Sequence, residues 1–232
     1  KINRYSKQLI LINSFFILAW LIISVFPFIW TFWGSFKVKA DFFSRADWMF
    51  AVTGVNTLIE TGDTSTVKAY VESWTEGEFW KATMNTIIIT VSVVTISLFL
   101  GTLGAYALSR STYKYTFWIL IAALIFRAMP HITLVSGYLF PFFQLNVWGI
   151  LPTTIIVLVA INQPFTLWLL YSFFKTVPKE LDESALIDGC SYFQAFRFVI
   201  MPVMWPGVVT AGLFSMMLAY NDFTVTSLLL NQ

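Results

Sequence analysis

Residues 82–109 read ATMNTIIITVSVVTISLFLGTLGAYALS, a stretch of 28 residues without a charged side chain. The hydrocarbon core of a membrane is about 30 Å thick, and a helix needs about 20 residues to cross it. The many β-branched residues are compatible with a helix in lipid, because a helix satisfies its backbone hydrogen bonds internally. The sequence therefore predicts that this stretch is a membrane-spanning helix.

Two other uncharged stretches have the length of one span each. Residues 8–36 contain LILINSFFILAWLIISVFPFIW, and we expect one helix here, which Pro27 kinks or ends. Residues 198–221 hold another span. The basic residues before the first stretch also resemble the start of a signal peptide, but the stretch is too long and lacks a small-residue cleavage site. We interpret it as an uncleaved first helix.

The 47 uncharged residues 128–174 are too many for one span. We expect them to include the end of a third helix that begins near Tyr115, followed by a short turn around residues 144–149. A fourth helix then runs from about Ile150 to Phe174. The sequence thus predicts an all-α fold, a polytopic transmembrane helical bundle with five spans.

The composition agrees with a membrane protein. Of the 232 residues, 58% are hydrophobic and 11% are charged, whereas soluble domains carry about 25% charge, and this excludes an ordinary cytosolic enzyme. The basic residues are scattered, which argues against nucleic acid as a partner. With one cysteine, Cys190, and one histidine, His131, an internal disulfide and a zinc site are excluded. We expect a single transmembrane domain over residues 1–232.

The charged loops predict the orientation. Basic residues are enriched in the loops on the cytoplasmic side of a membrane. They precede the first span and occupy the short loop between the second and third: Lys1, Arg4, Lys7, Arg110 and Lys114. The N-terminus is therefore expected in the cytoplasm. The polar segment 37–81 becomes an external loop, partly helical, and by parity the segment 175–201 faces the cytoplasm.

The cytoplasmic segment, KTVPKELDESALIDGCSYFQAFRFVIM (175–201), should form two short helices. Gly189 stands where a left-handed C-cap would end the first helix. Ser191 and Gln194 have the spacing of a capping box, so a second helix should begin at Tyr192. On spacing alone, a solvated loop that caps itself is an equal alternative.

The second short helix should present one packing face. Phe193, Phe196 and Ile200 recur at three to four positions, which places them on the same side of a helix. Pro202 then breaks the path as the fifth span begins.

The spacing within this segment resembles a family motif. Glu183-Ser184-Ala185, three residues, Gly189, nine residues and Val199-Ile200-Met201-Pro202 resemble the E-A-A, three, G, nine, I-x-L-P motif of ATP-binding cassette (ABC) importer permeases. The departures, Ser, Val and Met, are similar in size or apolar character. Weaker matches in order along the chain, among them Ala105–Arg110 and Tyr220–Phe223, are similar to the smaller permease of the maltose-type carbohydrate uptake family.

The resemblance implies a fold and a set of partners. The fold would be that of a type I ABC importer permease, with a sixth span after an outer loop beginning near Ser227. Such a permease lies in the cell inner membrane and works with a second permease, two cytoplasmic ATPase subunits and an external solute-binding protein. This chain has no G-x-x-x-x-G-K-[ST] run, so it should bind no cofactor, and ATP and Mg would bind the ATPase subunits. It would translocate a carbohydrate and would not itself be an enzyme.

The resemblance also implies roles for single residues. Glu183 would make the ionic contact with an ATPase subunit, Ala185 would permit its close approach, and Gly189 would form the bend between the two helices. Pro202 would direct the chain back into the membrane. The residues assigned to coupling are Glu183, Ser184, Ala185, Asp188, Gly189 and Pro202.

Polar residues near or within the spans are candidates for the solute pathway: Arg127, His131, Asn162, Asn221 and Asp222. Arg127 and His131 are four residues apart and so share a face of the third helix. Arg127 could instead reach an interface, and His131 could donate a packing hydrogen bond. Asn162 could bridge helices, and Asn221 with Asp222 could simply end one.

Two alternatives stay open for the function. The same type of transporter could carry another solute, such as glycerol phosphate, which Arg127 in the pathway would serve. A channel or membrane scaffold without an energy source would leave Glu183 without a role.

Whatever the function, Gly101 and Gly104 should let a neighbouring helix approach closely.

Overall fold

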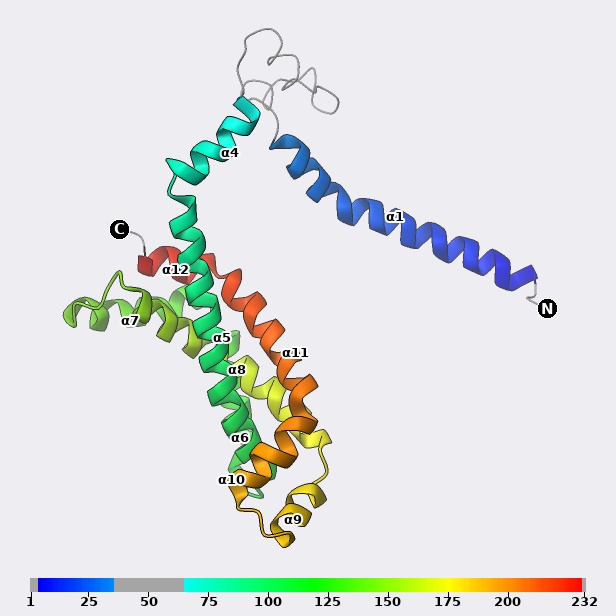
Figure 1. Cartoon of the computed structure of the whole chain (residues 1–232), viewed down its shortest axis with the longest axis vertical. Helices are drawn as coiled ribbons and strands as arrows, with labels where there is room; N and C mark the ends of the chain where they lie inside the picture. The colour runs from blue at the N-terminus through cyan, green and yellow to red at the C-terminus, as the bar shows by residue number, and fades with distance from the viewer. Residues whose placement is uncertain (1–3, 36–64, 231–232) are drawn as a thin grey trace. The chain divides into compact units, whose positions relative to one another are not determined.

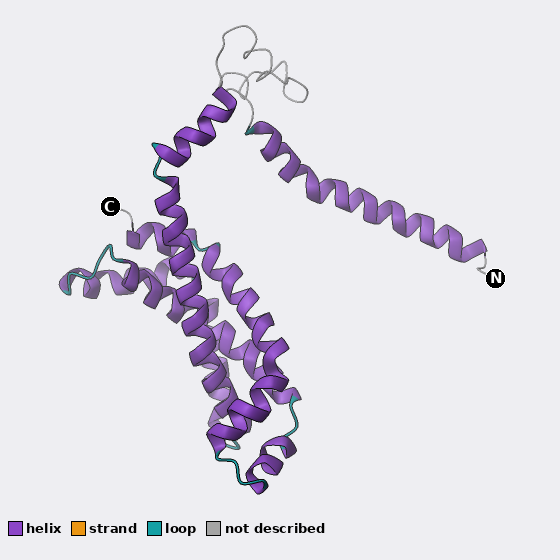
Figure 2. Cartoon of the chain, in the orientation of Figure 1, coloured by secondary structure: helices purple, strands orange, loops and turns teal. Residues whose placement is uncertain are grey.

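The computed structural model describes residues 4–35 and 65–230 of the chain. These residues are almost entirely helical and include no strand (Figure 2), so the predicted all-α fold is confirmed. The chain divides into two compact units, Lys1–Trp80 and Lys81–Gln232.

The first unit contains α1 (Arg4–Gly34) and α4 (Ser65–Thr75). Pro27 lies inside α1 and does not end it, because the helix runs on to Gly34. α4 falls within the predicted external loop, part of which is therefore helical, as expected. Residues 36–64, the rest of that loop before α4, lie outside the described residues.

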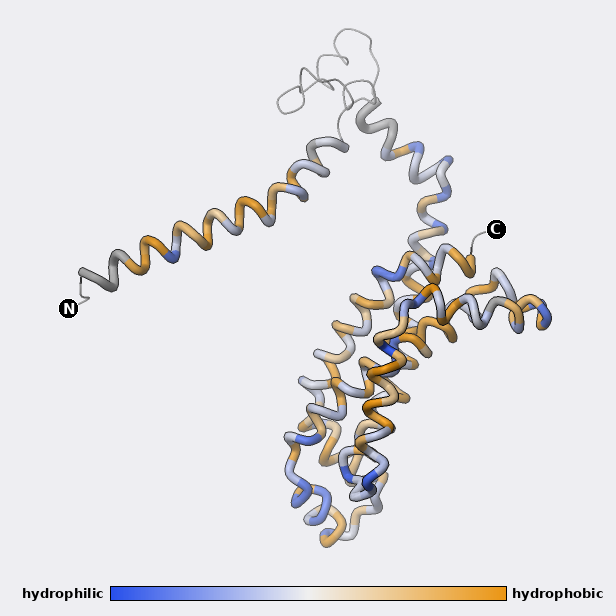
Figure 3. The backbone as a smooth tube through the Cα atoms, turned by 180° about the vertical axis from the view of Figure 1, so that it is seen from behind, coloured by the Kyte–Doolittle hydropathy of each residue, from blue (hydrophilic) through white to orange (hydrophobic). Residues whose placement is uncertain are grey.

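The second unit is a bundle of helices (Figure 1). α12 packs against α7 and α8 near one end of the bundle, and the short helices α9 and α10 lie at the opposite end. Figure 3 shows hydrophilic residues near α9 and hydrophobic residues along the length of the bundle. The bounds of its elements are α5 (Phe79–Arg110), α6 (Tyr115–Ala128), α7 (His131–Gln144), α8 (Leu151–Thr176), α9 (Glu180–Ile187), α10 (Tyr192–Gln194), α11 (Met201–Tyr220) and α12 (Phe223–Leu230).

Four described helical stretches are long and apolar enough to cross a membrane. They correspond to the predicted first, second, fourth and fifth spans: Leu9–Phe32, Phe79–Arg110, Leu151–Thr176 and Tyr192–Tyr220. The pair α6 and α7 gives a fifth span if it is counted as one crossing.

The predicted third span is not one continuous helix. α6 ends at Ala128, α7 begins at His131, and the two helices are bent by 94°. The ring of a proline disfavours a helical conformation of the residue before it, and Met129, which precedes Pro130, has an extended backbone. The 14 residues of α6 reach only about 21 Å. The break therefore turns the chain before it has crossed about 30 Å of hydrocarbon.

The predicted break at Pro202 is also wrong. Residues 192–220 form one unbroken helical stretch, in which Ala195–Ile200 adopt π-helical geometry and Pro202 lies in the first turn of α11. A proline interrupts a helix because it lacks an N–H and crowds the preceding turn. Here the wider turn lies immediately before it, where the amide of Met201 donates to the carbonyl of Phe196.

Small residues bring α5 and α8 together. A β-carbon placed at Gly101 would lie 3.1 Å from side-chain atoms of both Leu170 and Thr166, and one at Gly104 would lie 3.1 Å from Leu167. These distances leave little room for a larger side chain, so the predicted close approach is confirmed. Leu170 and Phe174 are fully buried and continue the same packing toward the end that carries α9.

Candidate coupling segment and a buried polar cluster

The first helix of the candidate coupling segment, residues 175–201, starts and stops as its sequence predicts. Acidic residues occupy the first turn of α9, where they favour the positive end of the helix dipole. Gly189 follows the helix with φ +86°, and its amide donates to the carbonyl of Leu186. The amide of Cys190 donates to the carbonyl of Ala185 at 3.0 Å. These two bonds form a Schellman motif, which satisfies carbonyls that a helix end would otherwise leave free.

Replacement of Gly189 by alanine is expected to destabilise this turn by about 1 kcal/mol, because a side chain disfavours positive φ. Hydrogen exchange at the Gly189 and Cys190 amides of the purified transporter would measure the loss of protection. Gly137→Ala is the matched control, since Gly137 lies inside α7 with no atom within 4 Å of an added β-carbon. Equal protection of the turn in wild type and Gly189→Ala would contradict the expectation.

The second helix begins at the predicted capping box. The amide of Gln194 donates to Oγ of Ser191 at 3.3 Å, and the amide of Ser191 donates to Oε1 of Gln194 at 2.8 Å. The predicted packing face is confirmed for Phe196 and Ile200, which are buried, but is wrong for Phe193, which is 63% exposed. Phe193 lies in α10, ahead of the π-helical stretch Ala195–Ile200, whereas both buried residues lie within that stretch.

An ion pair holds α9 against the end of α5. Nε of Arg110 lies 2.8 Å from Oδ2 of Asp182, and the hydroxyl of Tyr106 donates to Oδ1 of Asp182 at 2.5 Å. Arg110 also donates from Nη1 to the carbonyls of Phe174 and Val177, at 3.3 and 3.1 Å, where α8 ends. We call Tyr106, Arg110 and Asp182 the clamp.

The clamp is largely shielded from solvent. The side chains of Arg110 and Asp182 are only 16% and 13% exposed, and the Tyr106 ring packs against Phe174 and Phe196. Charge-assisted hydrogen bonds are stronger when water is excluded, and a buried charge that loses its partner is costly. The clamp therefore fixes α9 to the ends of α5 and α8.

No direct signal for the clamp is visible in the sequence. Arg110 contributed only to the prediction of orientation, and Asp182 only to the acidic first turn of a helix. One indirect hint was available. Arg110 ends the predicted second span, Asp182 lies in the first turn of the first cytoplasmic helix, and these opposite charges were expected on the same side of the membrane. Asp182 was therefore missing from the predicted coupling residues, although it is the acidic residue of α9 that binds within the chain.

The predicted coupling residues divide into an exposed and a buried set. Glu183, Ser184, Asp188, Gly189 and Pro202 are exposed, whereas Ala185 is 5% exposed and faces the chain's own interior. Among the described residues, no basic group lies within ion-pair distance of Glu183. Large apolar side chains stand exposed beside these carboxylates, namely Ile187, Tyr192 and Phe193. This mixed acidic and apolar surface is what we call the coupling face.

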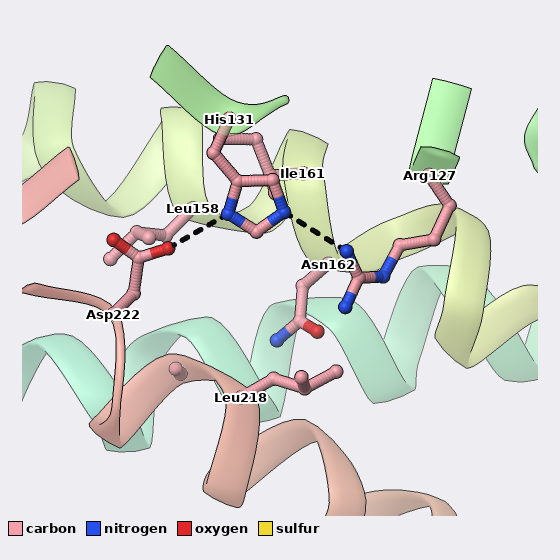
Figure 4. A pocket seen from close by; sticks show the side chains of 8 residues that line it. Arg127, His131, Leu158, Ile161, Asn162, Leu218 and Asp222 are labelled. Carbon is pink, nitrogen blue, oxygen red and sulfur yellow. Dashed lines mark hydrogen bonds and ion pairs between the residues drawn. The ribbon is translucent and has the colours of Figure 1, made fainter. Parts of the chain in front are cut away.

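Three charged or ionisable pathway candidates meet in a separate cluster at the break between α6 and α7 (Figure 4). Nη1 of Arg127 lies 3.0 Å from Nε2 of His131, and Nδ1 of His131 lies 3.2 Å from Oδ2 of Asp222. An arginine can only donate, so Nε2 accepts and the proton of a neutral imidazole is on Nδ1, directed at the carboxylate. His131 therefore links a cation to an anion.

The sequence placed Arg127 and His131 on one helix, and this was wrong. They lie on either side of the bend, in α6 and α7. Asp222, which lies between α11 and α12, supplies the acid that the spacing argument did not pair with His131, and its Oδ1 also accepts from the amide of Val225 at the start of α12. Asn221 is outside the cluster, since it is exposed and donates to Met217 of its own helix at 2.8 Å.

Asn162 completes the cluster from α8. Its Nδ2 donates to the carbonyl and to Oγ of Ser215 in α11, at 3.2 and 3.1 Å, which confirms the helix-bridging interpretation. The residue is 5% exposed, and its Oδ1 has no hydrogen-bond partner in the described part of the chain. A cavity of about 20 Å³, enough for one water molecule, is lined by all four polar residues.

The chain matches a known family over nearly its whole length. Residues 8–232 match the family described as "Binding-protein-dependent transport system inner membrane component". The chain therefore belongs to this family of transport permease subunits.

Individual relatives agree with this assignment. The diacetylchitobiose uptake system permease protein NgcG of Streptomyces coelicolor is 29% identical over 91% of this chain and 66% of its own length. The trehalose/maltose transport system permease protein MalG of Thermococcus litoralis is 32% identical over 94% of this chain and 73% of its own. This chain thus spans roughly two thirds to three quarters of the length of these two relatives.

A solved structure shares the fold. A chain of a bacterial ABC transporter involved in the import of the acidic polysaccharide alginate superposes with a TM-score of 0.76. The superposition covers 98% of this chain and 76% of that one, at 22% sequence identity. The predicted architecture, that of an ABC importer permease, is therefore confirmed.

Proposed function

We propose that this protein is the permease subunit of an ATP-driven importer that moves a carbohydrate delivered by an external solute-binding protein. The observation that carries the proposal is the coupling face: exposed carboxylates and apolar side chains on a segment that the clamp fixes to the bundle. The sugars named for relatives, diacetylchitobiose and trehalose or maltose, support the substrate class.

The proposed complex contains a second permease and two cytoplasmic ATPase subunits, which bind ATP and Mg. Glu183 pairs with a basic group in a cleft of an ATPase subunit, and Ile187 and Tyr192 enter an apolar part of the same cleft. Closure of the ATPase dimer displaces α9, and the two permeases move between inward-open and outward-open states. In the proposed complex, the coupling segment and the N-terminus lie in the cytoplasm.

Asp222 makes the glycerol phosphate alternative less favourable. Its carboxylate lies in the cluster with Arg127, so the cation there is already balanced within the chain. A phosphate entering the cluster would meet a carboxylate at close range, which is unfavourable in a medium of low dielectric. A neutral solute avoids this repulsion.

The test is ATPase stimulation in the complete transporter. The permease pair and its ATPase subunits, reconstituted in proteoliposomes, should hydrolyse ATP faster when a cognate binding protein loaded with maltose, trehalose or diacetylchitobiose is added. The unloaded binding protein is the control. A lack of stimulation by any loaded protein would contradict import, and solute flux that persists without ATP would favour a channel.

A further inference from the structure

We propose that the cavity lined by Arg127, His131, Asn162 and Asp222 is a subsite that binds one hydroxyl group of the transported solute. This inference rests on the proposed function, because it assigns a contact for the carbohydrate within this subunit. The cavity lies between α6, α7, α8 and the end of α11, on the second unit of the chain. Figure 4 shows the polar side chains converging on it.

The orientation of the Asn162 amide follows from its partner. The carbonyl of Ser215 can only accept a hydrogen bond, so the amide nitrogen of Asn162 must be the atom that faces it. The oxygen Oδ1 is then directed elsewhere, and it has no partner among the described residues although the residue is 95% buried (5% exposed). A buried acceptor without a partner is rare in folded proteins, and it requires a donor.

The charges around the cavity restrict what that donor can be. Arg127 uses Nη1 for His131, and the rest of its guanidinium can donate to a second group in the cavity. An ammonium group would be repelled by Arg127, and a carboxylate or phosphate can neither donate to Asn162 nor approach Asp222 at low cost. A hydroxyl group both donates and accepts, so it satisfies Asn162 and Arg127 together.

The remaining two residues position Arg127. The imidazole of His131 accepts from the guanidinium, and Asp222 accepts from the imidazole, which fixes its tautomer. Asp222 is itself held by the amide of Val225. The cavity volume of about 20 Å³ matches one hydroxyl rather than a whole sugar ring, so the rest of the solute must lie outside it.

Water and a solute hydroxyl share this chemistry, and the experiment separates them. Import of maltose, trehalose and diacetylchitobiose is first measured in proteoliposomes that contain the complete transporter, its binding protein and ATP. The KM of the imported sugar is then compared with those of its monodeoxy analogues, in wild type and in Asn162→Leu. We expect one missing hydroxyl to raise the wild-type KM about tenfold and to have no further effect in Asn162→Leu.

The matched control is Thr154→Val. Thr154 is fully buried in α8, and its hydroxyl, like Oδ1 of Asn162, has no partner within residues 4–35 and 65–230, but it does not line the cavity. It should respond to each analogue as wild type does. Arg127→Gln provides a second variant in case Asn162→Leu does not assemble, and it should abolish the same discrimination.

Two results would overturn the inference. If every deoxy analogue has the same relative KM in wild type, Asn162→Leu and Arg127→Gln, the cavity holds water only, while the proposed function stands. If the wild-type transporter imports none of the three sugars although ATP is hydrolysed, the proposed substrate class fails and the inference fails with it.

Discussion

Asp182→Asn should abolish ATP-driven import while leaving the transporter in the membrane. The substitution keeps the shape of the side chain but removes the charge that faces Arg110, whose side chain is only 16% exposed. Loss of one partner from a buried ion pair costs about 3 kcal/mol or more, because the other charge stays unpaired. α9 should then separate from the ends of α5 and α8, and movement of the ATPase subunits should no longer reach the bundle.

Import and ATP hydrolysis are measured together to distinguish this outcome from misfolding. The expected result for Asp182→Asn is residual ATP hydrolysis with import reduced to background. Glu180→Gln makes the same chemical change at an exposed acid in the first turn of α9 and should import normally. Wild-type import by Asp182→Asn would show that the clamp has no part in coupling.

Glu183→Arg should weaken assembly with the ATPase subunits without affecting the fold of this chain. The carboxylate of Glu183 is exposed and has no basic partner among the described residues, so its reversal breaks no contact within the chain. In the proposed cleft, the new guanidinium would face a basic group. We expect the affinity for the ATPase subunits to fall by about 2 kcal/mol, or roughly thirtyfold in Kd.

Copurification of the ATPase subunits and thermal unfolding of the permease measure the two parts of this prediction. Glu76→Arg is the control, because it reverses an exposed carboxylate on the segment expected outside the cell. It should keep the ATPase subunits bound. Retention of both ATPase subunits by Glu183→Arg, at wild-type affinity, would remove the ionic contact from the proposal.

The parts of the fold that follow local rules could be predicted from the sequence. Uncharged stretches located the spans, and the turn between α9 and α10 follows from Gly189, Ser191 and Gln194, whose effects act over a few residues. The bend at Met129-Pro130 was missed because a stretch of uncharged residues does not show where a helix changes direction. Proline there was a usable signal, since it restricts the preceding residue.

Contacts between distant residues could not be predicted in the same way. Arg110 and Asp182 are far apart in sequence, and only the packing of α5 against α8 and α9 brings their charges together. Arg127 and His131 were paired from their spacing, and the contact exists, but across a bend rather than along a helix. The role of Asp222 required knowledge of where α11 ends relative to α7.

The unbroken helical stretch from Tyr192 to Tyr220 has a mechanical consequence. Its 29 residues extend about 43 Å, and no loop interrupts them. One end adjoins the turn at Gly189, and the other leads directly to Asp222. If the helix is tilted at its Tyr192 end, the Tyr220 end therefore moves sideways, and the carboxylate of Asp222 moves with it.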